Sequence, residues 1–167
     1  MSHSESVATH TIQLFYNEQS RTDALVGFVR QGLEAGDTVL VVATREHWES
    51  ATARLLQRGL RLDADIASYR LTVCNAAAML DQLKTDRTVQ RDRFDKVVAA
   101  RVRHLRARGA RVRAYGEMVD LLAAEGDFAN VVRLEALWNE LMLTDPIDLL
   151  CGYSATHLGH PRNTEAR

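Results

Sequence analysis

Five short runs of β-forming residues alternate with helical patterns, and this alternation constrains the fold more than any other feature of the chain. The runs are TIQLFY (11–16), TVLVVA (38–43), RLTVC (70–74), RVRAY (111–115) and IDLLCGY (147–153). A helix between successive strands lets the chain cross back and start the next strand in the same direction. The sequence therefore predicts an α/β fold with a mostly parallel sheet of five strands, or slightly more, and helices on both faces.

The segments between these runs show helical spacing with recognisable ends. Helices are predicted over about 21–35, 45–58, 76–84 and 91–108, and over two segments on either side of Gly126. The first two stop at Gly36 and Gly59, where a left-handed residue commonly ends a helix. The polar stretch KTDRTVQRD (84–92) is expected to be a mobile or inserted loop, with a helix as the alternative.

Length and charge bound the class of protein. With 167 residues, 46% of them hydrophobic, the chain can bury the core of one domain. The expected division is a disordered segment 1–9, a domain 10–153 and a flexible tail 154–167. No apolar run is long enough to span a bilayer and the first residues lack a signal-peptide pattern, so a cytoplasmic protein is expected. The net charge of −1 predicts no direct contact with nucleic acid or membrane.

The usual catalytic and metal-binding motifs are missing from the sequence. Cys74 and Cys151 each lie in a strand-like run, outside any CxxC pair, and are expected to be reduced core thiols. The histidines do not form an HExxH or similar pair, and no serine lies in a GxSxG elbow. The sequence therefore predicts neither a metal, a cofactor nor a catalytic residue.

The carboxyl ends of the predicted strands are the candidate ligand site, because parallel strands bring these ends to one edge of the sheet. The candidates at this edge are Tyr16, Asn17, Arg45, Glu117 and Tyr153. Glu117 directly follows a strand and begins a helix, where the helix dipole favours a negative charge. Two roles stay open for it at this point, a helix cap and a contact to the ligand.

Glu135 is a carboxylate in an apolar stripe. On a helical wheel it falls among Val131, Leu134, Trp138 and Met142. A carboxylate at such a position needs a partner, because burial of an unpaired charge costs several kcal/mol. The expected partners are Arg113 and Asn139, and a structural polar pair is favoured over a catalytic acid.

Several motifs together resemble the MEDS family of sensory domains, over about 10–153. They are HTIQLFYNE, FVRQGLEAGDTVLVVAT, RFDKVV, VRAYGEMVDLLAAEGDFANVVRLEALWNEL and LLCGYS. The order of GEM, LExLWN and LCxY carries the resemblance. The aspartate-alanine pair that the family usually has after its third strand is replaced by Cys74, Asn75 and Ala76.

The resemblance implies a fold similar to the RecA and KaiC ATPases, with a sensory rather than a hydrolytic role. A phosphate-binding loop uses glycine amides and a lysine. The corresponding segment 16–23 has neither, and Glu18 adds negative charge, so it is expected to be a degenerate P-loop. The alternative is a residual nucleotide-binding protein or NTPase, with Glu117 or Glu46 as catalytic carboxylate and Arg45 or Arg21 on phosphate.

The function expected on these grounds is a non-enzymatic signal-transduction domain. It would bind a small-molecule signal or a partner protein at the carboxyl edge of its sheet and act in trans on a regulator. The expected partners are a histidine kinase, an anti-sigma factor or a transcription regulator. A homo-oligomer is left open.

Overall fold

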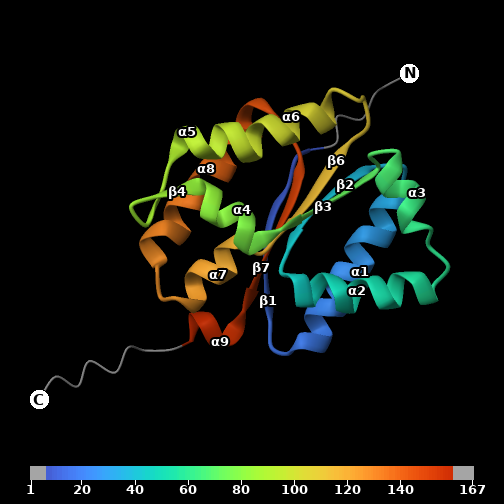
Figure 1. Ribbon diagram of the computed structural model, residues 1–167, viewed down its shortest axis with the longest axis horizontal. Coiled ribbons are helices and arrows are strands. Elements are labelled where there is room, and N and C mark those ends of the chain that lie inside the picture. Colours follow the sequence, from blue (N-terminus) through green and yellow to red (C-terminus); the bar gives the residue numbers. More distant parts are fainter. Residues whose placement is uncertain (1–6, 160–167) are drawn as a thin grey trace, which may run out of the picture.

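A five-stranded parallel sheet lies at the centre of the computed structural model, which describes residues 7–159. The strands run in the order β1-β7-β6-β2-β3 (Figure 1). Their bounds are β1 His10–Phe15, β2 Thr38–Ala43, β3 Leu71–Asn75, β6 Val112–Gly116 and β7 Asp148–Ser154. Each matches a predicted run within one residue at either end, and the predicted α/β class with a parallel sheet is confirmed.

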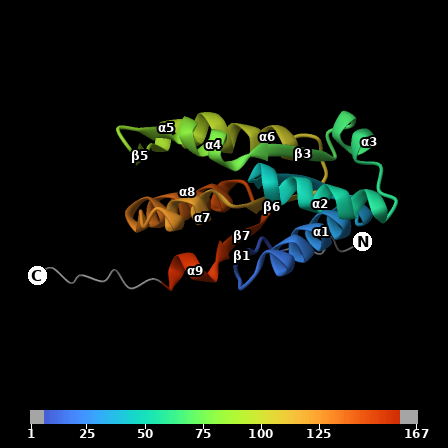
Figure 2. The same cartoon turned by 60° about the horizontal axis from the view of Figure 1, so that its bottom comes forward.

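Helices cover both faces of the sheet. They are α1 Glu18–Glu34, α2 Arg45–Gln57, α3 Leu62–Ala67, α4 Ala76–Leu83, α5 Arg91–Phe94, α6 Ala100–Arg106, α7 Met118–Ala124, α8 Phe128–Thr144 and α9 Ala155–Leu158. A π-helical turn, Asp95–Ala99, joins α5 to α6. Helices α1, α2 and α3 lie on one side of the strands, and α4 to α8 lie on the other (Figures 1 and 2).

Alternation along β2 produces two hydrophobic cores. Val39 and Val41 pack with α1 and α2, whereas Leu40 and Val42 pack with α4, α7 and α8. Successive side chains of a strand point to opposite faces, and all six residues of β2 are buried. A strand that is apolar throughout is typical of the middle of a parallel sheet covered on both faces.

The order of the strands creates a topological switch point between the carboxyl ends of β2 and β6. The connection from β2 crosses to β3 on the α2 side of the sheet, and the connection from β6 returns to β7 on the α7 and α8 side. The two loops therefore leave neighbouring strands toward opposite faces. In open α/β sheets such a switch point is the usual place for a binding site.

Residues 84–89 of the polar stretch form a hairpin where a loop or a helix was predicted, and the last two residues of the stretch, Arg91 and Asp92, begin α5. The strands of the hairpin are β4 Lys84–Thr85 and β5 Thr88–Val89. Asp86 and Arg87 have φ of 49° and 63°, the left-handed geometry that a two-residue hairpin turn needs. The Asn130 side chain of α8 accepts from the Val89 amide and donates to the Arg87 carbonyl. This tertiary contact holds a turn that lacks the usual glycine.

Part of the predicted flexible tail 154–167 is ordered into α9, which follows β7 directly. The rest of that segment from residue 160, and residues 1–6 of the segment predicted to be disordered, lie outside the described residues. Helix α3 was not predicted. The predicted domain boundaries remain predictions.

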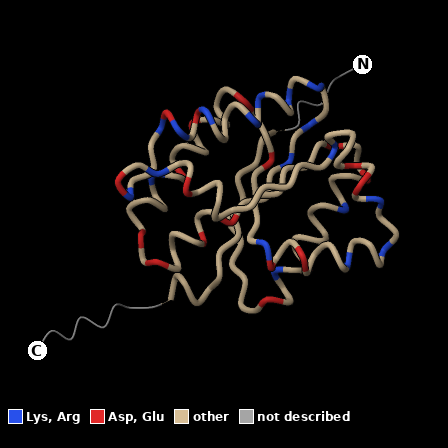
Figure 3. Tube along the Cα trace, viewed as in Figure 1, with Lys and Arg blue, Asp and Glu red and all other residues tan. Residues whose placement is uncertain are grey.

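Charges of both signs are spread over helices and loops, and the strands carry few of them (Figure 3). Several of the arginines between residues 101 and 113 contact acidic side chains. Arg103 and Arg106 bond Asp145, and Arg111 pairs with Asp148. No helix within residues 7–159 has the length and apolar character needed to cross a lipid bilayer.

Candidate functional site

Glu117 is the centre of a buried polar network at the switch point. It directly follows β6 and is 1% exposed. Its Oε1 accepts from the Tyr115 hydroxyl (2.7 Å) and Arg21 Nη1 (3.4 Å), and its Oε2 accepts from the Thr44 amide (2.8 Å) and His47 Nδ1 (2.9 Å). Burial, reinforced by the Glu117 charge, raises the pKa of Tyr115 well above its ordinary value. The hydroxyl therefore stays protonated as a donor to Glu117.

Arg21 joins this carboxylate to a second one. It lies in the first turns of α1, is 1% exposed, and donates to Asp120 Oδ2 at 2.8 Å. Its guanidinium carbon lies 4.9 Å from the centre of the Phe15 ring. A buried charge is tolerated only when it is paired and hydrogen-bonded. Its Nε nevertheless has no hydrogen-bond partner within residues 7–159.

Gly152 in β7 provides the space for this packing. A Cβ at this position would lie 2.8 Å from Phe15 Cε2, 3.1 Å from the Tyr115 hydroxyl and 3.6 Å from Arg21 Nη1. The first of these distances is shorter than van der Waals contact allows. The network can therefore sit against β7 only because this residue has no side chain.

His47 links the network to the surface at the start of α2. Its Nδ1 contacts Glu117 Oε2, and its Nε2 contacts Glu18 Oε2 at 2.8 Å. Both ring nitrogens face acceptors, which suits the doubly protonated imidazolium. Burial and the nearby Arg21 charge oppose that form, but the bond to Glu117 and the two carboxylate charges outweigh them, so the pKa of His47 lies above its ordinary value.

Asp120 ties the last strand into the same network. Its Oδ1 accepts from the Ser154 amide at 2.8 Å and from His157 Nδ1 at 2.7 Å, and its Oδ2 accepts from Arg21. These contacts fix the end of β7 and the short helix α9. The buried carboxylates and Arg21 thus connect the carboxyl ends of β1, β2, β6 and β7.

A small open pocket lies beside this network, at the carboxyl ends of β2 and β3. Its volume is about 140 Å³, and its lining comprises Ala43, Thr44, Arg45, Trp48, Val73, Cys74 and Asn75. Thr44 belongs to both features, because its amide donates to Glu117 while the residue lines the pocket. A molecule in the pocket would therefore contact a residue that is bonded directly to the network.

The five candidate residues at the sheet edge occupy different environments. Tyr16 is 79% exposed, and Asn17 caps α1 by accepting from the Ser20 amide. Arg45 lines the pocket and pairs with Glu49 on the surface. The Glu117 carboxylate makes no capping bond to α7, since it is directed at Thr44, His47, Tyr115 and Arg21. Thr44, which precedes Arg45 in the chain and lines the same pocket, donates its amide to Glu117.

The fifth candidate, Tyr153, points to the opposite face of the sheet, toward α8. There its hydroxyl donates to Glu135 Oε1 at 2.6 Å. Glu135 also contacts His10 and Cys151. Of the two partners expected for Glu135, Asn139 contacts it only indirectly, through His10. The other, Arg113, instead lies over the Phe28 ring, with its Nε 3.9 Å from Asp37.

Two residues of the network, Arg21 and Asp120, could have been identified from the sequence but were not predicted. Arg21 lies one turn before Leu25 and two turns before Val29, and so on the buried stripe of α1. Asp120 is the single charged residue in the segment MVDLLAA that forms α7. A charge in an apolar stripe calls for a buried partner, as was argued for Glu135. His47 and His157 lie in polar surroundings in the sequence, and nothing local distinguishes them.

The sequence of this chain matches a known family of sensory domains. The family model MEDS, the methanogen/methylotroph, DcmR sensory domain, matches residues 9–167. The chain belongs to the MEDS family. The match includes all five strands, the network and the pocket, and it confirms the resemblance proposed from the sequence motifs. No curated protein matches the chain.

Membership of the MEDS family bears on the role of the site. The family is described as a sensory domain, so a role for the chain in sensing and signalling is consistent with its membership. The likeness to RecA and KaiC remains a prediction. The features to be explained are a small pocket and a buried charge network that share one residue.

Proposed function

We propose that this MEDS domain is a non-enzymatic signal-transduction module that binds a small ligand in the pocket between the ends of β2 and β3. The observation that carries the proposal is the bond from the Thr44 amide to Glu117 Oε2. Thr44 also caps α2, accepting from the His47 amide at 3.3 Å. A ligand that displaces Thr44 would therefore act at once on the start of α2 and on the buried network.

The pocket favours a molecule of a few non-hydrogen atoms with one polar end. Its volume of about 140 Å³ is well below the roughly 300–1,000 Å³ of pockets that hold drug-sized ligands. Trp48 and Val73 offer apolar surface, and Thr44, Arg45 and Asn75 offer polar groups. Such a mixture is typical of small-molecule sites, where apolar contact supports binding and a few polar groups fix orientation.

The network supplies a route from the pocket to other surfaces. It connects α1 through Arg21, α7 through Asp120 and α9 through His157. A ligand shifts a conformational equilibrium only when it binds the two states differently. Loss or strengthening of the Thr44 bond provides that difference. The output then passes in trans to a regulator, for which a histidine kinase, an anti-sigma factor or a transcription regulator is proposed.

Several contacts weigh against the alternative of a residual NTPase. Arg21 is committed to two carboxylates and is buried, so it is not free to hold phosphate. Glu117 is buried and already accepts four hydrogen bonds. Glu46 is exposed in the first turn of α2. None of these groups is arranged around a phosphate cradle.

Chemical-shift mapping tests the proposed function. The ¹⁵N-labelled protein is titrated with alcohols, aldehydes, amides and carboxylates of a few carbon atoms, and separately with magnesium-ATP. We expect at least one of the four classes to give saturable shifts at the Thr44 amide, the Trp48 indole and the Asn75 amide. Magnesium-ATP should leave residues 16–23 unshifted.

A pair of valine substitutions provides the control. Val73→Phe places a ring in the pocket, whereas Val132→Phe makes the same change on the exposed surface of α8. Val132→Phe should keep the melting temperature of the parent, both variants should stay folded by circular dichroism, and only Val73→Phe should lose the ligand shifts. Shifts that survive Val73→Phe would place the ligand elsewhere, and hydrolysis of magnesium-ATP by the protein would favour the alternative.

A further inference from the structure

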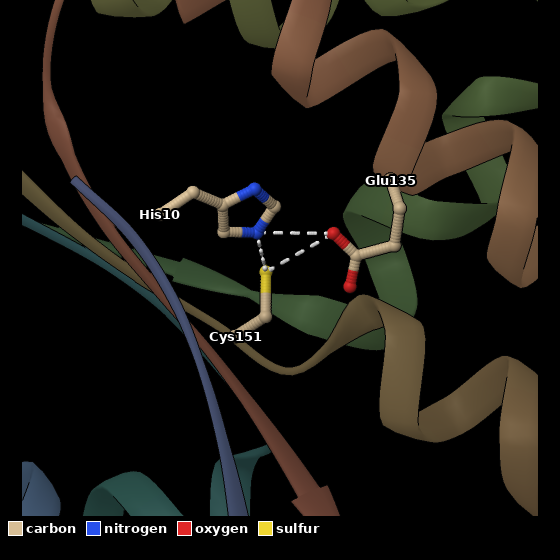
Figure 4. Close-up of side chains that lie close together, drawn as sticks. All are labelled: His10, Glu135 and Cys151. Carbon is tan, nitrogen blue, oxygen red and sulfur yellow. Dashed lines mark hydrogen bonds and ion pairs between the residues drawn. The ribbon is translucent and has the colours of Figure 1, made fainter. Parts of the chain in front are cut away.

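Three side chains with different metal-ligating atoms meet on the face of the sheet opposite to the Glu117 network. His10 comes from β1, Cys151 from β7 and Glu135 from α8. Figure 4 shows all three pointing toward one another. His10 Nε2 lies 3.1 Å from Glu135 Oε2 and 3.4 Å from Cys151 Sγ, and the sulfur lies 3.8 Å from the same carboxylate oxygen.

These separations are close to the edges of a zinc-centred tetrahedron. Zinc lies about 2.0–2.1 Å from histidine nitrogen, about 2.0–2.2 Å from carboxylate oxygen and about 2.3 Å from thiolate sulfur. At tetrahedral angles, those lengths place nitrogen and oxygen about 3.4 Å apart and sulfur about 3.6 Å from either. Each observed distance differs from these values by a few tenths of an ångström, so only small shifts would bring the three atoms to bonding distance of one ion.

The neighbouring groups orient the ligands as they do in metal sites. Asn139 Oδ1 lies 2.7 Å from His10 Nδ1, so this nitrogen donates and the ring is held with Nε2 facing Glu135 and Cys151. The Tyr153 hydroxyl donates to Glu135 Oε1, which leaves Oε2 to face the same point. Metal-binding histidines and carboxylates are commonly held by outer hydrogen bonds of this kind.

The cluster is open on one side. Cys151 is 1% exposed, whereas the side chains of His10 and Glu135 each keep 15% of their surface accessible. β1 is the edge strand of the sheet, so no further strand covers His10 from that side. Three protein ligands with an accessible fourth position are typical of zinc sites that exchange a ligand, whereas structural sites are closed by four protein ligands.

We propose that His10, Glu135 and Cys151 form a site for a zinc-type divalent cation whose fourth position takes a small exogenous ligand. On binding, the ion displaces the thiol proton of Cys151 and any proton shared by His10 and Glu135, and these protons pass to the solvent. The site uses β7 from the face opposite to Gly152 and Ser154. It does not depend on the pocket between β2 and β3.

Cobalt(II) is the probe that distinguishes this site from an ordinary ion pair beside a thiol. The untagged full chain is treated with a chelator, exchanged into clean buffer and titrated with Co²⁺ while absorption is recorded. We expect a sulfur-to-cobalt charge-transfer band and intense visible bands of four-coordinate cobalt, saturating at one equivalent and removed by Zn²⁺. No sulfur-to-cobalt band, or bands that increase without saturation, would overturn the proposal.

The two cysteines provide a matched control. Cys151→Ser should abolish the charge-transfer band, and Cys74→Ser should leave it intact, because Cys74 lies in β3, at the edge of the sheet opposite to β1. If Cys151→Ser folds poorly, His10→Ala at the sheet edge serves instead, with the fold checked by circular dichroism. It should lower the cobalt affinity at least tenfold. Bands that survive both Cys151→Ser and His10→Ala would refute the site.

Two further measurements separate the parts of the proposal. Asn139→Ala should weaken cobalt binding by roughly 10- to 100-fold through loss of the outer hydrogen bond to His10. Azide added to the cobalt-loaded protein should shift the visible bands, since it can occupy the fourth position. Visible bands that azide leaves unchanged would overturn the open position.

Discussion

Replacement of Glu117 is the most informative perturbation of this molecule, because four hydrogen bonds from four different residues end on its carboxylate. Two of the donors, Arg21 and His47, are charged or favour the charged form. A hydrogen bond to a charged group contributes about 1.5–3 kcal/mol, and breaking a buried charge pair costs about 3–5 kcal/mol. Since Arg21 keeps Asp120 as a partner, we expect Glu117→Ala to cost about 4 kcal/mol.

A loss of this size is a large part of the stability of a single domain, which is about 5–15 kcal/mol. The milder Glu117→Gln keeps the shape and two acceptor lone pairs and is expected to cost about 2 kcal/mol. Both are measured by urea unfolding at equilibrium, followed by tryptophan fluorescence and circular dichroism. Glu49→Gln is the matched control, because the Glu49 pair with Arg45 is exposed and should not change the free energy of unfolding measurably.

The same substitution in a variant that lacks Arg21 tests whether the two residues are coupled. With Arg21→Met, the carboxylates of Glu117 and Asp120 lose the cation that they share, so Glu117→Gln should then cost less or become stabilising. The network interpretation would be refuted if Glu117→Gln changed the free energy of unfolding no more than Glu49→Gln does. It would also be refuted if the cost of Glu117→Gln were the same with and without Arg21.

Three further predictions concern residues around the network and the hairpin. Gly152→Ala should lower the free energy of unfolding by about 1–3 kcal/mol in urea, because its Cβ would lie 2.8 Å from Phe15. The pKa of His47 is raised in the folded protein. The stabilisation from its protonation should therefore be complete below pH 6.5, the ordinary pKa of histidine, and be lost as pH rises through the folded pKa. The difference in free energy of unfolding between the parent and His47→Gln should accordingly shrink from acidic to alkaline buffer. Asn130→Ala should increase amide hydrogen exchange at Val89, whose N–H it leaves without its acceptor.

The sequence alone was sufficient for the sheet and most helices. The run TVLVVA is apolar throughout because β2 is covered on both faces. This pattern lies within six consecutive residues, so it can be recognised without knowledge of the tertiary structure. The stops at Gly36 and Gly59 are equally local, since both have the positive φ that ends a helix, 80° and 82°. The family could also be recognised from the sequence, because its motifs occur in a fixed order along the chain.

Local patterns did not determine the turn at 84–89 or the partners of the buried charges. Asp86 and Arg87 adopt left-handed φ because Asn130, from a helix distant in sequence, bonds the hairpin. A charge in an apolar stripe shows that a partner is needed, as for Glu135, but it does not say which residues of the sheet meet it. The partner depends on strand order.

Only the tertiary structure determined which functional side chains lie close together. Arg21 reaches Asp120 across 99 positions in the sequence, because β1 lies beside β7 and near β6 rather than next to β2. His10, Glu135 and Cys151 come together for the same reason, since β1 and β7 pair in parallel and α8 packs over them. Metal motifs such as HExxH are visible in a sequence because one helix presents both ligands. Ligands from three elements have no common spacing, and only the order of the strands brings them within bonding distance of one ion.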